Sequence, residues 1–338
     1  MTAELARPAE PGDREIDRRI LEIFRECAGG VVSGEALSGL LNVSRTAVWK
    51  HIKTLKNLGY RIEAVPSRGY RLVGSPDILI PAEISAGLGV RTIGSHLICF
   101  RETESTNVTA YKLAEEGAVE GTVVIADAQS RGKGRLGRSW ESPSGANLYC
   151  SVILRPPILP LHAPQLTFLS AVAVAEAIER TTSLAPAIKW PNDVLVNGFK
   201  VAGMLNEMSA ETERVEFIVL GIGVNINMRR DQFPAELRHP ASSLAIEQGG
   251  EVGRVPFIRA LLESLDRLYH AYLTDGYGPL REAWLSRSIV AGRRVRVSGS
   301  GAETVGTVEG IDEVGALLVR CADGRLETIY SGDVTVEG

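Results

Sequence analysis

The sequence predicts an α+β protein built from three parts. Residues 1–76 combine helical apolar spacing with a short hairpin, residues 77–290 alternate apolar strands with helices, and residues 291–338 carry short strands separated by glycines. The length of 338 residues fits two or three domains, and 44% hydrophobic with 23% charged residues is typical of a globular protein. We therefore expect an N-terminal winged helix-turn-helix, a central α/β domain and a small C-terminal β-barrel.

Three short helices are expected in the first part. We expect Asp13 to cap the first helix and Gly29-Gly30 to end it, because glycine is common at helix ends. The next two helices begin after Ser33 and Ser44, and Gly59 ends the last one. The apolar residues that recur at helical spacing predict the core, which consists of Ile16, Ile20, Ile23, Phe24, Cys27, Ala36, Leu37, Leu40, Leu41, Val48, Ile52 and Leu55.

A hairpin follows the third helix. Residues 60–65 and 70–73 alternate as strands around Pro66-Ser67-Arg68-Gly69, which are turn residues, so we expect a wing with an arginine at its tip. The first turn of the last helix in such a unit is the part that reaches base edges in the major groove. The residues expected to bind DNA are Ser44, Arg45, Thr46, Lys50, Lys53 and Arg68.

The charge distribution agrees with a polyanion partner at this end. Residues 1–76 contain twelve basic and nine acidic side chains, a net charge of +3, whereas the whole chain has a net charge of −4. A helical bundle with a merely solvated basic face would share the helix pattern. The tight turn and the arginine-tipped hairpin favour double-stranded DNA as the partner.

Metal, disulfide and membrane classes are not indicated. The cysteines at 27, 99, 150 and 321 lack C-x-x-C spacing, so we expect buried thiols and no metal site formed by the protein alone. The segment from Met1 to Arg19 is charged, and no run of 18 apolar residues is apparent. A cytoplasmic protein without membrane contact is expected.

A linker at Ser75-Pro76-Asp77 separates the first part from the second. The apolar patterns after it predict strands at 96–101, 121–128, 147–154, 201–208 and 215–221, helices at 106–116, 165–180 and 256–274, and about five strands from Arg293 onward.

A glycine-rich segment at residues 129–140 carries the strongest chemical signal. Gly132, Gly134 and Gly137 match the dinucleotide motif G-x-G-x-x-G, and residues 132–139 nearly match the Walker A loop. Both motifs must open a helix, but the residues after Trp140 lead into a strand, so both interpretations fail. A glycine-rich loop with the cations Arg131, Lys133, Arg135 and Arg138 remains. Such a loop can close over a phosphate, or it can be an exposed turn.

Two further segments hold polar side chains beside predicted strands. Lys189-Trp190-Pro191-Asn192-Asp193 ends a strand with a cation, an amide and a carboxylate, and Lys200 stands alone in an apolar strand, where it needs an anionic partner if it faces inward. Glu104-Ser105-Thr106-Asn107 places hydroxyl and amide groups at a helix start. These groups either hold the polar end of a ligand or act as an ordinary N-cap.

In this order, the motifs resemble those of the biotin protein ligases. The resemblance rests on Ser-Thr-Asn at 105–107, Gln129 with the Gly-Lys-Gly-Arg-x-Gly-Arg-x-Trp loop, Lys-Trp-Pro-Asn-Asp at 189–193 and Lys-x-Ala-Gly-Met-Leu at 200–205. The winged helix makes the chain similar to the bifunctional form that also represses biotin genes. The resemblance extends from about Ile20 to the end of the chain. It implies a class II synthetase-like mixed sheet in the central domain and an SH3-like C-terminal barrel.

The resemblance also implies a two-step reaction. Biotin and ATP, with Mg²⁺, give biotinyl-5′-AMP, and a lysine of the biotin carboxyl carrier protein of acetyl-CoA carboxylase then takes the biotinyl group. Operator DNA is the second implied partner, with a homodimer when the adenylate is bound.

Matching the motifs position by position implies functional roles for residues in all of these segments. Arg135 and Lys200 are the implied catalytic residues. The implied biotin and adenylate contacts are Ser105, Thr106, Asn107, Gln129, Lys133, Gly134, Arg135 and Lys200, and the implied ATP and Mg²⁺ contacts are Trp140, Asn192, Asp193 and Asn225. The chain departs from the commonest loop pattern at Lys133, where arginine is frequent, and at Leu136, where another arginine can occur. Lysine cannot clamp a phosphate bidentately.

Two other functions fit parts of the pattern. A transcription factor that only senses a metabolite would not require Lys200 together with an intact basic loop. A lipoate or octanoate ligase shares the family architecture, but the Lys-Trp-Pro-Asn-Asp motif and the winged helix favour biotin.

Overall fold

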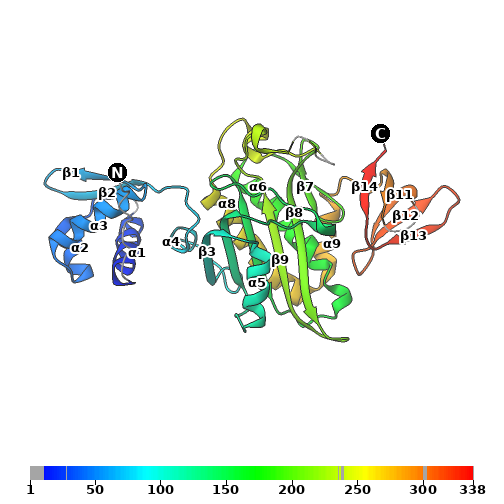
Figure 1. The fold of residues 1–338 in the computed structure, drawn as a ribbon, viewed down its shortest axis with the longest axis horizontal. Coiled ribbons are helices and arrows are strands. Elements are labelled where there is room, and N and C mark those ends of the chain that lie inside the picture. The colour runs from blue at the N-terminus through cyan, green and yellow to red at the C-terminus, as the bar shows by residue number, and fades with distance from the viewer. Residues whose placement is uncertain (1–10, 28, 235, 237–239, 300–302, 338) are drawn as a thin grey trace. The chain divides into compact units, whose positions relative to one another are not determined.

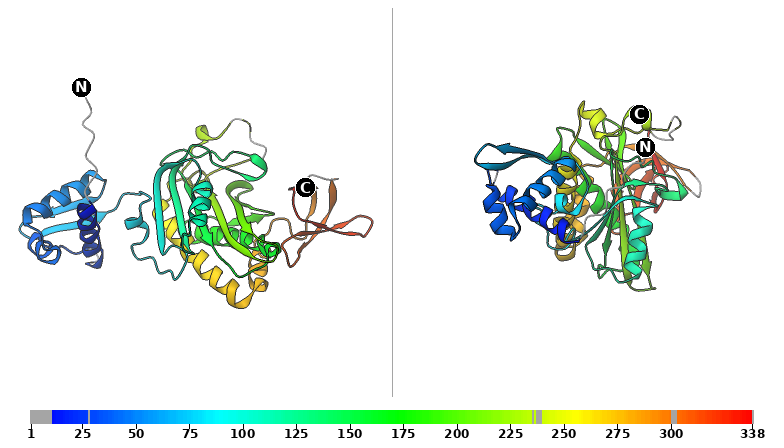
Figure 2. Two further views of the ribbon diagram at one scale, coloured as in Figure 1. Left: turned by 60° about the horizontal axis from the view of Figure 1, so that its bottom comes forward. Right: turned by 60° about the vertical axis from the view of Figure 1, so that its left-hand side comes forward.

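The computed structural model describes residues 11–27, 29–234, 236, 240–299 and 303–337. The chain divides into two compact units, residues 1–78 and 79–338, which are described separately. Figures 1 and 2 show the elements of each unit.

The first unit is a winged helix-turn-helix, as expected. Ser33 and Ser44 cap the second and third helices, each by accepting a hydrogen bond from the backbone N–H three residues later. Val32 bridges Tyr70 and so joins the hairpin to the helices. The elements are α1 (Pro11–Glu26), α2 (Gly34–Leu41), α3 (Arg45–Asn57), β1 (Arg61–Val65) and β2 (Gly69–Gly74), and the two strands pair antiparallel.

Three expectations for this unit were wrong. Helix α1 begins at Pro11, so Asp13 lies within the helix and not at its cap. Ala36 and Leu40 are exposed, because the eight-residue α2 buries only a narrow stripe centred on Leu37. Cys27 is also exposed, since it lies just past the last residue of α1.

The second unit is built on a seven-stranded mixed sheet. The strand order is β3-β4-β5-β9-β8-β7-β6, in which β3 and β4 are parallel and the other neighbours are antiparallel. The strands are β3 (His96–Thr103), β4 (Thr122–Gln129), β5 (Leu148–Leu154), β6 (Pro186–Lys189), β7 (Asp193–Val196), β8 (Phe199–Ala210) and β9 (Val215–Val224).

Helices cover both faces of this sheet (Figure 1). Helix α5 packs on β4, β5 and β9, where it buries a small apolar cluster, while α6, α8 and α9 build the main core on the opposite face. Their bounds are α5 (Thr106–Glu115), α6 (Gln165–Thr181), α8 (Arg254–Asp275) and α9 (Tyr277–Leu285), and the short helices are α4 (Pro81–Ile84) and α7 (Leu244–Gln248).

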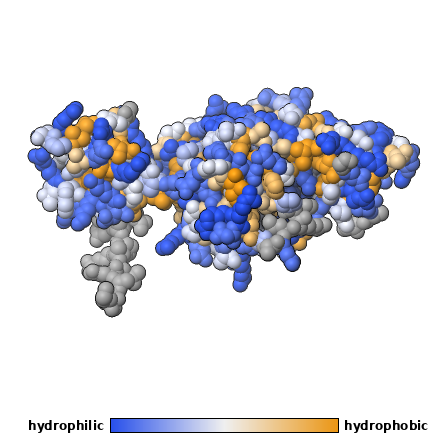
Figure 3. Space-filling view, turned by 90° about the horizontal axis from the view of Figure 1, so that it is seen from above, coloured by the Kyte–Doolittle hydropathy of each residue, from blue (hydrophilic) through white to orange (hydrophobic). Residues whose placement is uncertain are grey.

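Helix α6 lies in a long apolar segment, which bears on the expected absence of membrane contact. Residues 160–181 are long and apolar enough to cross a membrane, but most of the apolar stretch is buried inside the protein, as in the core helix of a globular domain. The apolar pattern had predicted a helix at 165–180, and α6 confirms it. On the face in Figure 3, hydrophobic side chains occupy small separate areas among hydrophilic ones.

The chain ends in a five-stranded antiparallel sheet of order β13-β12-β11-β10-β14, called the C-terminal sheet below. It contacts the central domain directly: the Trp190 indole N–H donates to the Gly315 carbonyl oxygen at 3.1 Å, and Gln165 donates to that of Glu313 at 2.6 Å. Its strands are β10 (Arg294–Ser298), β11 (Thr304–Ile311), β12 (Leu317–Cys321), β13 (Leu326–Ile329) and β14 (Asp333–Val336).

Candidate active site

One cavity in the second unit brings together almost every residue that the motifs predicted. It lies between the glycine-rich loop, strands β8 and β9, the connection from β6 to β7, and the start of β14. The predicted residues that line it are Ser105, Thr106, Asn107, Gln129, Lys133, Gly134, Arg135, Trp140, Asn192, Asp193 and Lys200. Asn225 lines a neighbouring hollow, and its amide donates to the Ser242 carbonyl oxygen at 3.1 Å.

Glycines on β8 and β9 form the floor of the cavity. A Cβ atom at Gly221 would lie 2.1 Å from Asn107 Oδ1, and one at Gly223 would lie 2.7 Å from Trp140 Cε2. Glycine within a strand often marks a place where another group approaches the backbone closely. Here two side chains of the site occupy that space.

Hydroxyl and amide groups form the neutral end of the cavity. Gln129 Oε1 accepts from the Thr106 backbone N–H at 2.8 Å, and the Ser151 hydroxyl lies 2.8 Å from Thr106 Oγ1 and 2.7 Å from Asn107 Oδ1. Ser105 occupies the N-cap position of α5, but its side chain makes no capping hydrogen bond. Ser105 is thus an N-cap by position, but its hydroxyl does not supply the capping hydrogen bond.

The glycine-rich loop runs from β4 to β5 and folds back on itself. Gly134 donates to the Arg138 carbonyl oxygen at 2.7 Å, and Trp140 donates to that of Gly132 at 2.9 Å. A single turn of 3-10 helix, Arg135–Gly137, lies at its tip. Because no α-helix follows the glycines, the rejection of the dinucleotide and Walker A motifs is confirmed.

Three of the four loop cations line the cavity. Lys133, Arg135 and Arg138 face it, whereas Arg131 is 80% exposed and pairs with Glu104 at 3.2 Å. The Arg135 guanidinium donates to Asn192 Oδ1 at 3.0 Å, and burial lowers the pKa of Arg135 below its usual value.

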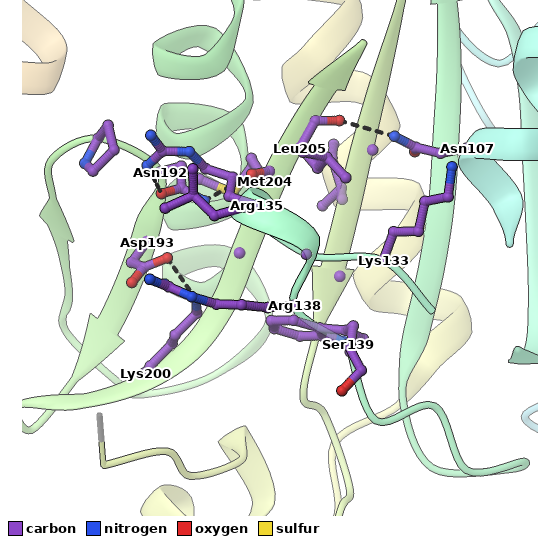
Figure 4. Close-up of a pocket in the computed structure, with 18 of the residues that line it drawn as sticks. Asn107, Lys133, Arg135, Arg138, Ser139, Asn192, Asp193, Lys200, Met204 and Leu205 are labelled. Carbon is purple, nitrogen blue, oxygen red and sulfur yellow. Dashed lines mark hydrogen bonds and ion pairs between the residues drawn. The ribbon is translucent and has the colours of Figure 1, made fainter. Parts of the chain in front are cut away.

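Lys200 has the anionic partner that its apolar strand required. Its Nζ atom lies 2.6 Å from Asp193 Oδ1, and both side chains are largely buried (Figure 4). Burial also lowers the pKa of Lys189, which lines the same end of the cavity. This end therefore concentrates positive charge in a place with little water, which favours an anionic ligand.

Trp140 lies flat on the glycine floor. Lys200 Nζ is 5.5 Å from the centre of its ring, within the range of a cation–π contact. The indole N–H is buried without a hydrogen-bond partner in the described part of the chain. The ring and its N–H therefore pack against the floor of the cavity.

Sequence reasoning did not identify four polar residues of this site: Ser142, Ser151, Glu207 and Asp333. Ser151 carried a usable signal, because a serine hydroxyl in a fully buried strand needs a hydrogen-bond partner. Asp333 carried none, since it lies at the start of the last strand and reaches the site only through the tertiary fold.

The first unit presents the residues expected to bind DNA. Arg45, Thr46, Lys50 and Lys53 are exposed along α3, and Arg68 is exposed in the turn between β1 and β2. The Ser44 hydroxyl oxygen accepts the hydrogen bond that caps α3. Lys53 Nζ lies 5.5 Å from the centre of the exposed Trp49 ring.

Family models match each part of the chain. The Biotin/lipoate A/B protein ligase family matches residues 99–225, an HTH domain matches residues 17–71, and the Biotin protein ligase C terminal domain matches residues 290–336.

Curated relatives extend over almost the whole chain. The Bifunctional ligase/repressor BirA of Bacillus subtilis (strain 168) is 41% identical over 315 residues, which cover 93% of this chain and 97% of the relative. The protein of the same name from Escherichia coli (strain K12) is 31% identical, covering 90% of this chain and 92% of the relative.

A solved structure matches the fold. The biotin protein ligase from Aquifex aeolicus, in complex with biotin and ATP, aligns with a TM-score of 0.62 and 29% identity. The alignment covers 72% of this chain and 99% of that structure.

Proposed function

Because the chain belongs to the biotin protein ligases, in their bifunctional ligase/repressor form, we propose that it converts biotin and ATP to biotinyl-5′-AMP and then biotinylates a carrier protein. It is an ATP-dependent biotin ligase with a DNA-binding repressor domain. The observation that carries the finer proposal is the cavity itself, which has neutral hydrogen-bonding groups at one end and cations at the other.

The neutral end suits the ring system of biotin. Ser105, Thr106, Asn107 and Gln129 offer hydroxyl and amide groups to a ureido head. The carboxylate of the side chain then extends toward the cations.

The cationic end suits adenylate formation. A carboxylate oxygen of biotin attacks the α-phosphorus of ATP, the bond to the β-phosphate oxygen breaks, and pyrophosphate leaves. Lys200 and Arg135 stabilise the negative charge that accumulates on the α-phosphate oxygens. Lys133 and Gly134 of the loop close over the product, and Trp140 packs on the adenine.

We propose that Asp193 and Asn192 contact the complex of Mg²⁺ and ATP. The described residues contain no cluster of three His, Cys, Asp or Glu side chains that could hold an ion by themselves. One carboxylate and one amide beside the phosphate cations fit a Mg²⁺ ion that arrives with ATP, because Mg²⁺ usually keeps waters and substrate phosphates as ligands. When bound, Mg²⁺ supplies charge neutralisation and orients the leaving pyrophosphate. Asn225 borders this region from the adjoining hollow.

The second step needs no protein nucleophile. The acyl group of the adenylate is a mixed anhydride, so the neutral amine of the acceptor lysine attacks its carbonyl carbon, AMP leaves and the amine loses a proton. Burial raises the pKa of the Cys150 thiol to about 12, which makes that cysteine inert. The acceptor is the biotin carboxyl carrier protein of acetyl-CoA carboxylase.

A biotin-dependent ATP–pyrophosphate exchange assay tests the ligase proposal. Exchange with biotin, and not with lipoate or octanoate, supports it. Exchange with lipoate or octanoate alone identifies the other branch of the matched family, and no exchange with any acid identifies a metabolite sensor.

The N-terminal unit binds operator DNA of biotin genes through α3 and the wing. Two copies on a homodimer reach two half-sites, and adenylate binding favours that dimer. ATP, carrier protein and DNA all occur in the cytoplasm, where the protein acts.

A further inference from the structure

One ion pair and a series of hydrogen bonds connect the two ends of the glycine-rich loop through the neutral end of the cavity. The chain of contacts starts at Lys133, near the beginning of the loop, and returns to the carbonyl oxygen of Trp140, at its end. Its members in order are Lys133, Glu207, Asn107, Ser151, Thr106, Gln129, Ser142 and Trp140.

The return to the loop is short and largely buried. Gln129 Nε2 donates to Ser142 Oγ at 2.9 Å, and Ser142 donates to the Trp140 carbonyl oxygen at 2.9 Å. Gln129, whose Oε1 atom accepts from Thr106, therefore holds the end of the loop as well as a proposed ligand contact. This half of the series of contacts therefore involves residues that already belong to the site.

Glu207 makes the other connection and has no role in the proposed chemistry. Its Oε2 atom accepts from Asn107 Nδ2 at 2.8 Å, and its Oε1 atom lies 3.8 Å from Lys133 Nζ. One carboxylate thus touches a proposed biotin contact and a loop cation. In Figure 4, Lys133 and Asn107 lie beside each other on one side of the cavity.

The Asn107 amide uses both of its N–H groups within the protein, so only its oxygen can accept a further hydrogen bond from a ligand. Its two N–H bonds go to the Leu205 carbonyl oxygen at 3.1 Å and to Glu207, and its oxygen lies 2.7 Å from the Ser151 hydroxyl. Because an amide can rotate to exchange its oxygen and nitrogen, these partners decide which atom faces the cavity. Glu207 can only accept, so it fixes the N–H side of the amide.

We propose that Glu207 is a positioning residue that orients Asn107 for the ligand head and anchors the loop through Lys133. This role rests on the proposed ligase function. Occupation of the neutral end by biotin then favours loop closure at the cationic end, because one carboxylate serves both. The Lys133 ammonium is a compact point charge, which suits pairing with a single carboxylate oxygen.

Two substitutions separate the two contacts. Glu207→Gln keeps an acceptor for Asn107 but removes the charge that attracts Lys133, so biotin affinity should stay within twofold while biotinyl-5′-AMP dissociates about two- to fivefold faster, the scale of a partly exposed ion pair. Glu207→Ala removes both contacts and should also weaken biotin binding about tenfold or more, since the buried amide loses a charged acceptor.

The matched control is Glu104→Gln, which removes the exposed ion pair between Glu104 and Arg131 of the same loop but outside the cavity. Biotin affinity is measured by calorimetry, adenylate release with labelled biotin, and loop order by trypsin cleavage at its arginines with and without biotin. Biotin should protect the loop in the wild-type and control proteins and not in Glu207→Ala.

The inference is overturned if folded Glu207→Gln and Glu207→Ala proteins both match the control in biotin affinity, adenylate release and protection. It is also overturned if Glu207→Gln weakens biotin binding as much as Glu207→Ala, because charge loss alone would then explain both. A wild-type protein that forms no adenylate contradicts the ligase proposal itself, which is a separate result.

Discussion

Arg138 of the glycine-rich loop and Asp333 of the C-terminal sheet form an ion pair of 2.7 Å, although 195 residues separate them in the chain. The hydrogen bond to Asp333 raises the pKa of Arg138 above its usual value. The C-terminal sheet therefore holds one side of a loop that closes the cavity.

Substitution of Asp333 by Asn should loosen the loop. The pair is partly exposed, so we expect about 0.5–1 kcal/mol, seen as a two- to fivefold rise in adenylate dissociation rate. Asp323→Asn, which breaks an exposed pair with Arg325 elsewhere on the same sheet, is the control. Equal adenylate release rates for the two variants would show that the C-terminal sheet does not help to hold the loop.

Lys200→Ala should lower the rate of adenylate formation about 10²- to 10³-fold, or about 3–4 kcal/mol, the usual cost of losing one preorganised charge stabiliser. The measurement is biotin-dependent pyrophosphate exchange, with circular dichroism to verify folding. A folded variant within tenfold of the wild-type rate would exclude Lys200 from the mechanism.

Arg135→Ala should release biotinyl-5′-AMP faster, because the variant lacks one of the buried cations that hold the phosphate under the closed loop. The intermediate is trapped with labelled biotin and chased with unlabelled biotin. Release at the wild-type rate would show that another group retains the adenylate.

Gly223→Ala should displace Trp140, since the new Cβ would lie 2.7 Å from its ring. We expect at least a tenfold increase in the KM for ATP with a smaller change in the KM for biotin. Gly278→Ala, where nothing lies within 4 Å of the new Cβ, should leave both constants unchanged. An unchanged KM for ATP in Gly223→Ala would show that Trp140 does not contribute to nucleotide binding.

Lys50→Ala should weaken operator binding at least tenfold without altering ligation, because Lys50 is exposed on α3 in a separate unit. Gel-shift titrations, with and without biotin and ATP, should also show that the ligands raise operator affinity in the wild-type protein. Equal affinity of the apo and adenylate-bound forms would contradict the coupling, and lost ligation in Lys50→Ala would contradict the separation of the units.

Local sequence signals located most of the fold and the site. Caps such as Ser33 and Ser44 act within one helical turn, and the loop, the segment at 189–193 and Lys200 lie on or between strands of the same sheet. Some residues that sequence reasoning did not identify, such as Asp333, depend on distant partners. Asp333 is brought to the loop by tertiary packing, and the helical pattern of α2 gave the direction of its buried face but not its width, which leaves Leu40 exposed.

The position of Asp333 also bears on how the protein can be fused or tagged. Peptide appended after the last strand, Asp333–Val336, would emerge within a few residues of the side chain that pairs with Arg138. A bulky or charged fusion there would compete with the loop for that carboxylate and alter how long the reactive intermediate is retained. A fusion joined before α1 would instead extend from the other compact unit.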